Sequence, residues 1–198
     1  MVRIAMWNGY TCTTTLPRFQ LPASDSPSQF PVRVLAIDPS LRSTGFAILE
    51  KLGTKVRVLE YGTIKNKPAL LPSGCLVAIH ERVRDLIEQH APECAAFEAI
   101  IYVQSFRTAI TLGTARGAAL LAAAGRGLPI YEYAPRRVKQ SVVGRGGADK
   151  GQVGFMVRAL LGLTETPSAD AADALAIGLT HFQTSESAGR GVGTMERI

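Results

Sequence analysis

The chain has 198 residues, a formal charge of 22 − 16 = +6, 46% apolar residues and 19% charged residues. This length and composition fit one soluble globular domain with tails, and they exclude wholesale disorder. No segment approaches the roughly 20 apolar residues of a membrane helix. Three cysteines without a CxxC pair (Cys12, Cys75 and Cys94) argue against a disulfide scaffold or a zinc site and favour a reducing, cytoplasmic location.

Residues 1–31 read as a disordered N-terminal extension, because they hold four prolines and a threonine run without a period of 2 or 3.6. They lack the apolar core of a signal peptide, so a mis-assigned start codon and an organelle transit peptide are both open. We expect one domain over residues 32–183. The Gly- and Ser-rich residues 184–198 read as a flexible tail.

Within the domain, the residue pattern predicts three successive strands, followed by helices alternating with two more strands. The strands are expected at 32–37, 44–50, 56–64, 94–101 and 129–133. Helical spacing is found around 76–87, 108–125, 135–143, 150–161 and 169–182. A hairpin start followed by β-α-β-α units predicts an α/β fold: a five-stranded mixed sheet, three antiparallel strands and then parallel ones, with helices on both faces.

Four acids occupy positions where a carboxylate is costly to bury. Asp38 ends an apolar strand, Glu98 lies in an otherwise uncharged run, and Asp170 and Asp173 share one face of an alanine-rich helix. Three of them have a simple alternative: Asp38 could start a turn, Glu98 could pair with an arginine, and Asp170 could cap its helix. Asp173 lies deeper in the apolar helix and is harder to explain in this way. Together they point to a site, and oxygen ligands without nearby Cys or His favour Mg²⁺ or Mn²⁺.

Two such ions, held by the four carboxylates, would suit phosphodiester hydrolysis by activated water. The partner is indicated by charge, because residues 107–158 contain nine basic residues opposed only by Glu132 and Asp149. A solvated helix face is the alternative. The expected nucleic-acid contacts in this stripe are Arg107, Arg116, Arg136, Lys139, Arg145 and Lys150.

Several segments, taken in order, resemble the RuvC family of Holliday-junction resolvases. They are residues 37–45 (IDPSLRSTG), Glu98, 112–117 (LGTARG), 131–136 (YEYAPR), 138–144 (VKQSVVG) and 170–176 (DAADALA). The resemblance implies a ribonuclease-H-like fold and a homodimer that cuts four-way DNA junctions by paired symmetric nicks, leaving 5′-phosphates, in recombination and repair. It implies Mg²⁺ as cofactor, with Mn²⁺ as a substitute, and a RuvA–RuvB branch-migration complex as candidate partner.

By the same resemblance, the family's four catalytic carboxylates fall on Asp38, Glu98, Asp170 and Asp173, and its two functional lysines on Lys139 and Lys150. The chain departs from the family at Ser40, which is commonly glycine, and at Ile101, where members often place an aromatic residue that stacks at the junction centre. Tyr102 or Phe106 is the expected substitute, unless both belong to the core or the surface.

Three other functions remain open at this stage. The first is a ribonuclease-H-like or integrase-type nuclease acting on another nucleic acid. The second is an actin-like or sugar-kinase module, which 198 residues hardly accommodate. The third is a catalytically silent junction-binding protein, against which the presence of all four acids argues.

Overall fold

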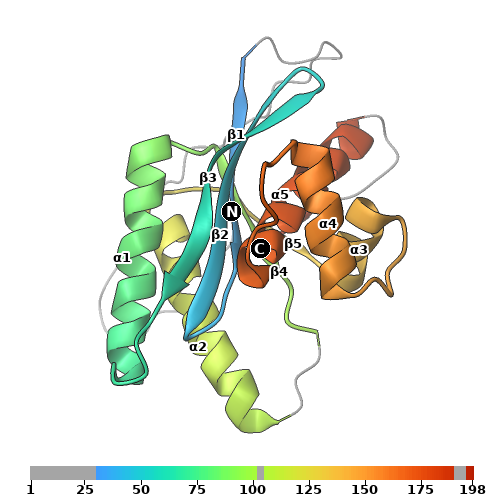
Figure 1. The fold of residues 1–198 in the computed structure, drawn as a ribbon. Coiled ribbons are helices and arrows are strands. Elements are labelled where there is room, and N and C mark those ends of the chain that lie inside the picture. Colours follow the sequence, from blue (N-terminus) through green and yellow to red (C-terminus); the bar gives the residue numbers. More distant parts are fainter. Residues whose placement is uncertain (1–29, 102–104, 190–194) are drawn as a thin grey trace.

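The computed structural model describes residues 30–101, 105–189 and 195–198, and they form three layers with a sheet in the middle (Figure 1). The strands are β1 (Val32–Asp38), β2 (Ser43–Leu52), β3 (Lys55–Lys65), β4 (Cys94–Glu98), β5 (Ile130–Tyr133) and β6 (Glu196–Arg197). The helices are α1 (Pro72–His90), α2 (Phe106–Ala124), α3 (Pro135–Val143), α4 (Lys150–Leu161) and α5 (Ala169–Gly189). No described helix is long and apolar enough to cross a membrane.

The strand order is β3-β2-β1-β4-β5-β6. The first three strands pair antiparallel, while β4 pairs parallel with both β1 and β5. The predicted five-stranded mixed sheet is therefore confirmed. Three features differ from the prediction. β4 ends at Glu98 and not at residue 101, α5 continues past Phe182 to Gly189, and the short antiparallel edge strand β6 was not expected. The predicted extension at 1–31 falls almost entirely outside the described residues.

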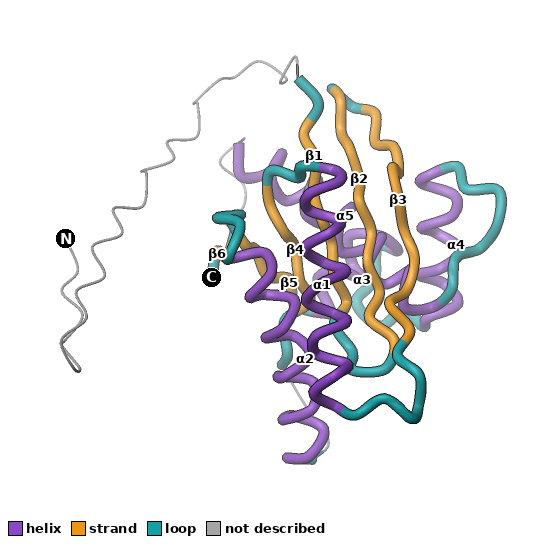
Figure 2. The backbone as a smooth tube through the Cα atoms, turned by 90° about the vertical axis from the view of Figure 1, so that its left-hand side faces the viewer, coloured by secondary structure: helices purple, strands orange, loops and turns teal. Residues whose placement is uncertain are grey.

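The two faces of the sheet carry separate cores. α1 and α2 cover one face, and α3, α4 and α5 cover the other (Figures 1 and 2). β1 lies between β2 and β4, so its residues Val34–Ile37 are buried on both faces, which explains their uninterrupted apolar run.

α5 packs close to the sheet because small residues line the contact. Ala171, Ala174 and Ala176 are buried there. At Gly178, even a single added Cβ would lie 2.3 Å from the Leu49 side chain and 3.3 Å from Ala36 Cβ. The alanine-rich sequence of this helix thus fixes its distance from the strands, and with it the place of the two aspartates at its start.

Candidate active site

The core of the site is the edge of the sheet where β1 and β4 end. Asp38 is the last residue of β1 and Glu98 the last of β4. The strands are parallel neighbours, with Ile37 opposite Phe97, so the next residue on each strand is an acid at the same edge. Polar groups at the carboxyl ends of adjacent parallel strands are the usual place for chemistry in such sheets.

Asp170 reaches this edge through a close backbone approach at Gly45. Gly45 is the cross-strand partner of Asp38, and a Cβ at position 45 would lie only 2.0 Å from the main-chain oxygen of Asp170. Only glycine leaves room for the start of α5 at this point. The Ser43 hydroxyl donates a hydrogen bond of 2.5 Å to Asp170 Oδ2, which fixes that carboxylate beside the β1–β2 turn.

Asp173 follows one helical turn later on the same face of α5. The ammonium group of Lys150, the first residue of α4, lies 3.3 Å from Asp173 Oδ2. The negative charge of Asp173 raises the pKa of Lys150, so the lysine stays charged. The structure thus brings all four predicted carboxylates and one predicted lysine into one region.

Three of the acids in this region have raised pKa values. Burial, followed by the charges of Glu98, Asp173 and Asp170, raises the pKa of Asp38 to about 8. Burial and the neighbouring Asp173 also raise the pKa of Glu98, and burial raises that of Asp173 despite Lys150. A group of carboxylates that repel one another in a partly desolvated pit is stabilised by a bound cation or by protonation.

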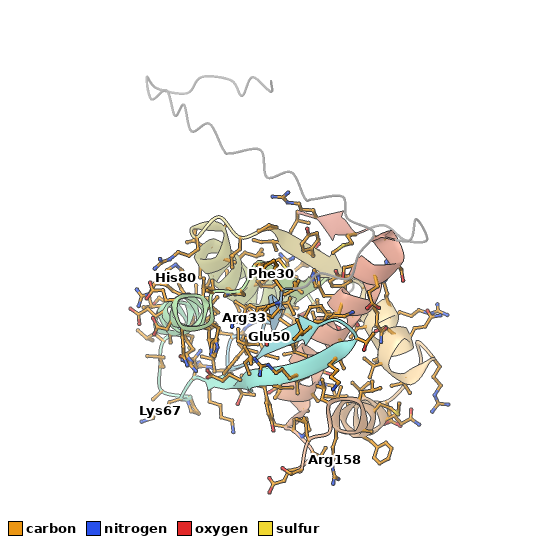
Figure 3. The ribbon with its side chains drawn as sticks, turned by 90° about the horizontal axis from the view of Figure 1, so that it is seen from above. Phe30, Arg33, Glu50, Lys67, His80 and Arg158 are labelled. Atoms are coloured by element: carbon orange, nitrogen blue, oxygen red, sulfur yellow. The ribbon has the colours of Figure 1, made fainter. Side chains whose placement is uncertain are left out.

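A fifth buried acid, Glu50, shows the opposite behaviour at the other end of the sheet. Glu50 is only 3% exposed, and both Arg33 (2.8 Å) and Arg57 (2.6 Å) pair with its carboxylate (Figure 3, Arg33 and Glu50 labelled). The hydrogen bond from Arg33 is the main cause that lowers the pKa of Glu50. Sequence reasoning missed this residue, and the comparison separates a neutralised structural acid from the four acids of the site.

The donor set fits a hard divalent cation, because carboxylate oxygens are the ligands that Mg²⁺ and Mn²⁺ prefer. Within the described part of the chain, no three acidic, histidine or cysteine side chains already converge on a single cation position. Two of the acids are instead engaged by protein groups, Asp170 by Ser43 and Asp173 by Lys150. To share a cation with Asp38 and Glu98, the side chains of Asp170 and Asp173 would therefore have to turn away from these partners.

A hollow of about 360 Å³ opens at Asp38 and Glu98. Pro135 and Arg136 from the start of α3 line it, together with Leu112 of α2 and residues 99–101 after β4. We call this hollow the catalytic pit. Arg136 thus lies at the rim of the carboxylates, as a phosphate-binding residue should.

The other predicted nucleic-acid contacts divide into two groups. Lys139 is half-buried on α3, and its charge opposes the raised pKa of Glu98 and Asp173. Arg107 and Arg145 are exposed, the first at the start of α2 and the second in the loop between α3 and α4.

Arg116 points away from solvent. Its side chain is 13% exposed, pairs with Glu132 of β5, and lies 5.6 Å above the Phe97 ring. These contacts argue against the predicted DNA contact and indicate that Arg116 holds α2 against the sheet. Sequence reasoning counted Glu132 only as an acid within the basic stripe, so the pairing was missed.

Of the two aromatic residues predicted to stack at the junction centre, the structure describes one. Tyr102 lies outside the described residues. Phe106, the first residue of α2, is 89% exposed, and Ile101 and Ile110 are exposed as well. Phe106 therefore does not belong to the core, and Ile101 lines the catalytic pit.

Comparisons with known proteins agree with this geometry. The family model "Crossover junction endodeoxyribonuclease RuvC" matches residues 34–181. A RuvC from Akkermansia muciniphila is 54% identical over 155 residues, which are 78% of this chain and 93% of that protein. A RuvC from Sodalis glossinidius is 45% identical over 155 residues, or 78% of this chain and 89% of that protein.

Solved structures show the same fold. Thermus thermophilus RuvC in complex with a Holliday junction substrate matches with a TM-score of 0.75 and 34% identity, covering 84% of this chain and 99% of that one. The yeast mitochondrial Holliday junction resolvase shares only the fold, with a TM-score of 0.55 and 16% identity over 79% of this chain and 80% of that one. The chain belongs to the RuvC family of crossover junction endodeoxyribonucleases.

Proposed function

We propose that this protein resolves four-way DNA junctions by paired, symmetric hydrolysis of two phosphodiesters. One observation carries the proposal. In a domain that the RuvC family model matches, four carboxylates from β1, β4 and α5 lie at one edge of the sheet, beside basic residues. The Thermus relative described above was solved with such a junction, which supports the choice of substrate.

Asp38, Glu98, Asp170 and Asp173 would hold Mg²⁺, two ions in all, with Mn²⁺ as a substitute. Such ions supply an activated water for attack on phosphorus and charge stabilisation for the leaving oxygen, and the product carries a 5′-phosphate. Around them, Arg136 orients the phosphate, while Lys139 and Lys150 offset the negative charge that gathers in the pit.

A homodimer is supported by an open face on α2. Gly113 and Gly117 have no atom within 4 Å of an added Cβ, and Ile110 and Leu121 on the same side are exposed. Ala119 and Ala123, by contrast, are buried in the core that α2 shares with α1 and the sheet. The open face permits close packing of α2 against a second copy, which would set two catalytic pits on one junction.

A RuvA–RuvB branch-migration complex remains the predicted partner, and the cytoplasm the predicted compartment. The two cysteines within the described residues, Cys75 and Cys94, are free thiols, as expected in a reducing compartment.

The test uses a mobile synthetic four-way junction, a linear duplex and an RNA–DNA hybrid, each with Mg²⁺ and with EDTA. We expect paired nicks of like polarity in the junction alone, sealed by ligase and abolished by EDTA. Cleavage of the hybrid without cleavage of the junction would overturn the proposal in favour of a ribonuclease-H-like activity. Tight junction binding without cleavage in Mg²⁺ or Mn²⁺ would indicate a binding protein.

A further inference from the structure

A second hollow lies between the end of α3 and the first turns of α4. It is open and has a volume of about 510 Å³. Its lining includes Val143, Arg145, Gly151, Gln152, Phe155 and Met156. We call it the α4 groove.

Phe155 is the main apolar surface of this groove. α4 packs on the domain through Val153, Gly154 and Val157, which are buried. Phe155 faces the other way and is 65% exposed. A large aromatic side chain held in water on a rigid helix has no role in the core, and such rings are typical of binding surfaces.

Residues of the groove are neighbours of residues of the site at two places. Arg136 lines the pit, and its side chain lies against Gly146, where an added Cβ would be 2.4 Å from Arg136 Cγ. The preceding residue, Arg145, lines the groove. At the second place, Lys150 reaches Asp173 in the site, and the next residue, Gly151, lines the groove. The groove therefore borders the region of the four carboxylates on the side of α3 and α4.

The charge of the groove favours a polyanion. Its one acid, Asp149, caps α4: its carboxylate accepts a hydrogen bond of 2.8 Å from the Gln152 main-chain N–H. Arg145 has no ion pair or hydrogen bond with any residue of the described chain and is exposed on the loop. Its guanidinium group is available to a phosphate from outside.

We propose that the α4 groove is a nucleotide subsite, in which Phe155 stacks on an unpaired base next to the scissile phosphate and Arg145 binds the adjoining phosphate. A paired base inside a duplex offers only its edge, so stacking on Phe155 requires a base that has left its partner. The ligand is thus a DNA strand opened at a branch point. The inference rests on the proposed function and adds to it a site for the open strand.

The test compares Phe155→Ala with Phe155→Trp and with Leu160→Ala. Leu160 is also exposed on α4 (50%) but does not line the groove, so its variant is the matched control. Binding is measured in EDTA on a four-way junction and on a duplex of the same sequence. In parallel, 2-aminopurine replaces each base near the mapped nick, and its fluorescence reports stacking.

We expect Phe155→Ala to weaken junction binding roughly tenfold, the lower range for loss of one base stack, with duplex binding unchanged. One 2-aminopurine position should be quenched by the wild-type protein and not by Phe155→Ala, while Phe155→Trp restores both binding and quenching. Equal junction affinity for Phe155→Ala and Leu160→Ala, with no quenched position, would overturn the subsite and leave Phe155 to a protein contact. Junction cleavage by the wild-type protein, scored separately, tests the proposed function.

Discussion

The substitution Gly45→Ala tests how the site is assembled, because it adds one methyl group where α5 meets β2. The new Cβ would lie 2.0 Å from the main-chain oxygen of Asp170, against about 3.4 Å for ordinary contact, so the start of α5 must retreat by about 3.4 − 2.0 = 1.4 Å. The obstacle is backbone, which cannot rotate away. Overpacking of this kind costs about 1–3 kcal/mol of folding stability.

The larger effect is expected on cleavage. A displacement of about 1 Å between reacting groups lowers catalytic rates by roughly 10²-fold. Here it would move Asp170 and Asp173 away from Asp38 while leaving the basic surface intact. We therefore expect Gly45→Ala to fold, to bind a four-way junction like the wild type, and to nick it about a hundredfold more slowly in saturating Mg²⁺.

Gly62→Ala is the matched control. Gly62 lies in the neighbouring strand β3, opposite Phe46, and its added Cβ would meet only the end of the Phe46 ring at 3.3 Å. That side chain can adjust, so cleavage should stay near the wild-type rate. If Gly45→Ala cleaved as fast as Gly62→Ala, the close approach at position 45 would not position the carboxylates.

Further variants test single groups of the site and of the core. Asp173→Asn should lower junction cleavage by roughly three orders of magnitude, since a catalytic metal site supplies several kcal/mol, yet keep junction binding in EDTA; loss of binding would contradict this. Lys150→Ala removes the ammonium group 3.3 Å from Asp173, so the Mg²⁺ concentration that gives the half-maximal rate should fall. The maximal rate should drop about 10- to 100-fold, which corresponds to the loss of a hydrogen bond to a charged group. His181 is buried, and desolvation lowers its pKa to about 4. Below its unfolded pKa of about 6.5 only the unfolded state gains the proton at this residue, so the contribution of His181 to stability falls by about 2 kcal/mol from pH 7 to pH 5. In urea unfolding, the change in unfolding free energy from pH 7 to pH 5 should therefore be about 2 kcal/mol more favourable for His181→Asn than for the wild type, whereas His80→Asn, on α1, keeps the wild-type change; equal changes in all three proteins would refute the assignment.

Most of the fold could be predicted from sequence because the signals are local. The run at 34–37 has no polar interruption, as a strand between two neighbours requires, and the alanine-rich segment at 169–182 predicted the helix α5. The edge strand β6 could not be predicted, because two residues, Glu196 and Arg197, carry no period, and their pairing with β5 depends on tertiary placement.

The carboxylates of the site could also be predicted, since an acid in an apolar run is visible in the sequence. What brings them together was not visible. Gly45 has no Cβ, and this leaves room for the start of α5. Ser43 makes a hydrogen bond to Asp170, which lies 127 positions later in the chain. The buried position of Glu50 could not be predicted, because its partners Arg33 and Arg57 come from adjacent strands whose register only the structure gives.

Buried acids near the two ends of β1 have opposite pKa shifts. At its start, the protein supplies Arg33 and Arg57 as fixed partners, and the carboxylate of Glu50 is stabilised in its charged form. At its end, one fixed cation, Lys150, pairs with Asp173, and the pKa of Asp38 rises to about 8. A fully neutralised pit would gain stability but would have no attraction left for a divalent cation. The carboxyl of Asp38 has no fixed cationic partner, so a divalent cation that displaces its proton, and with it a phosphate, can bind at this edge.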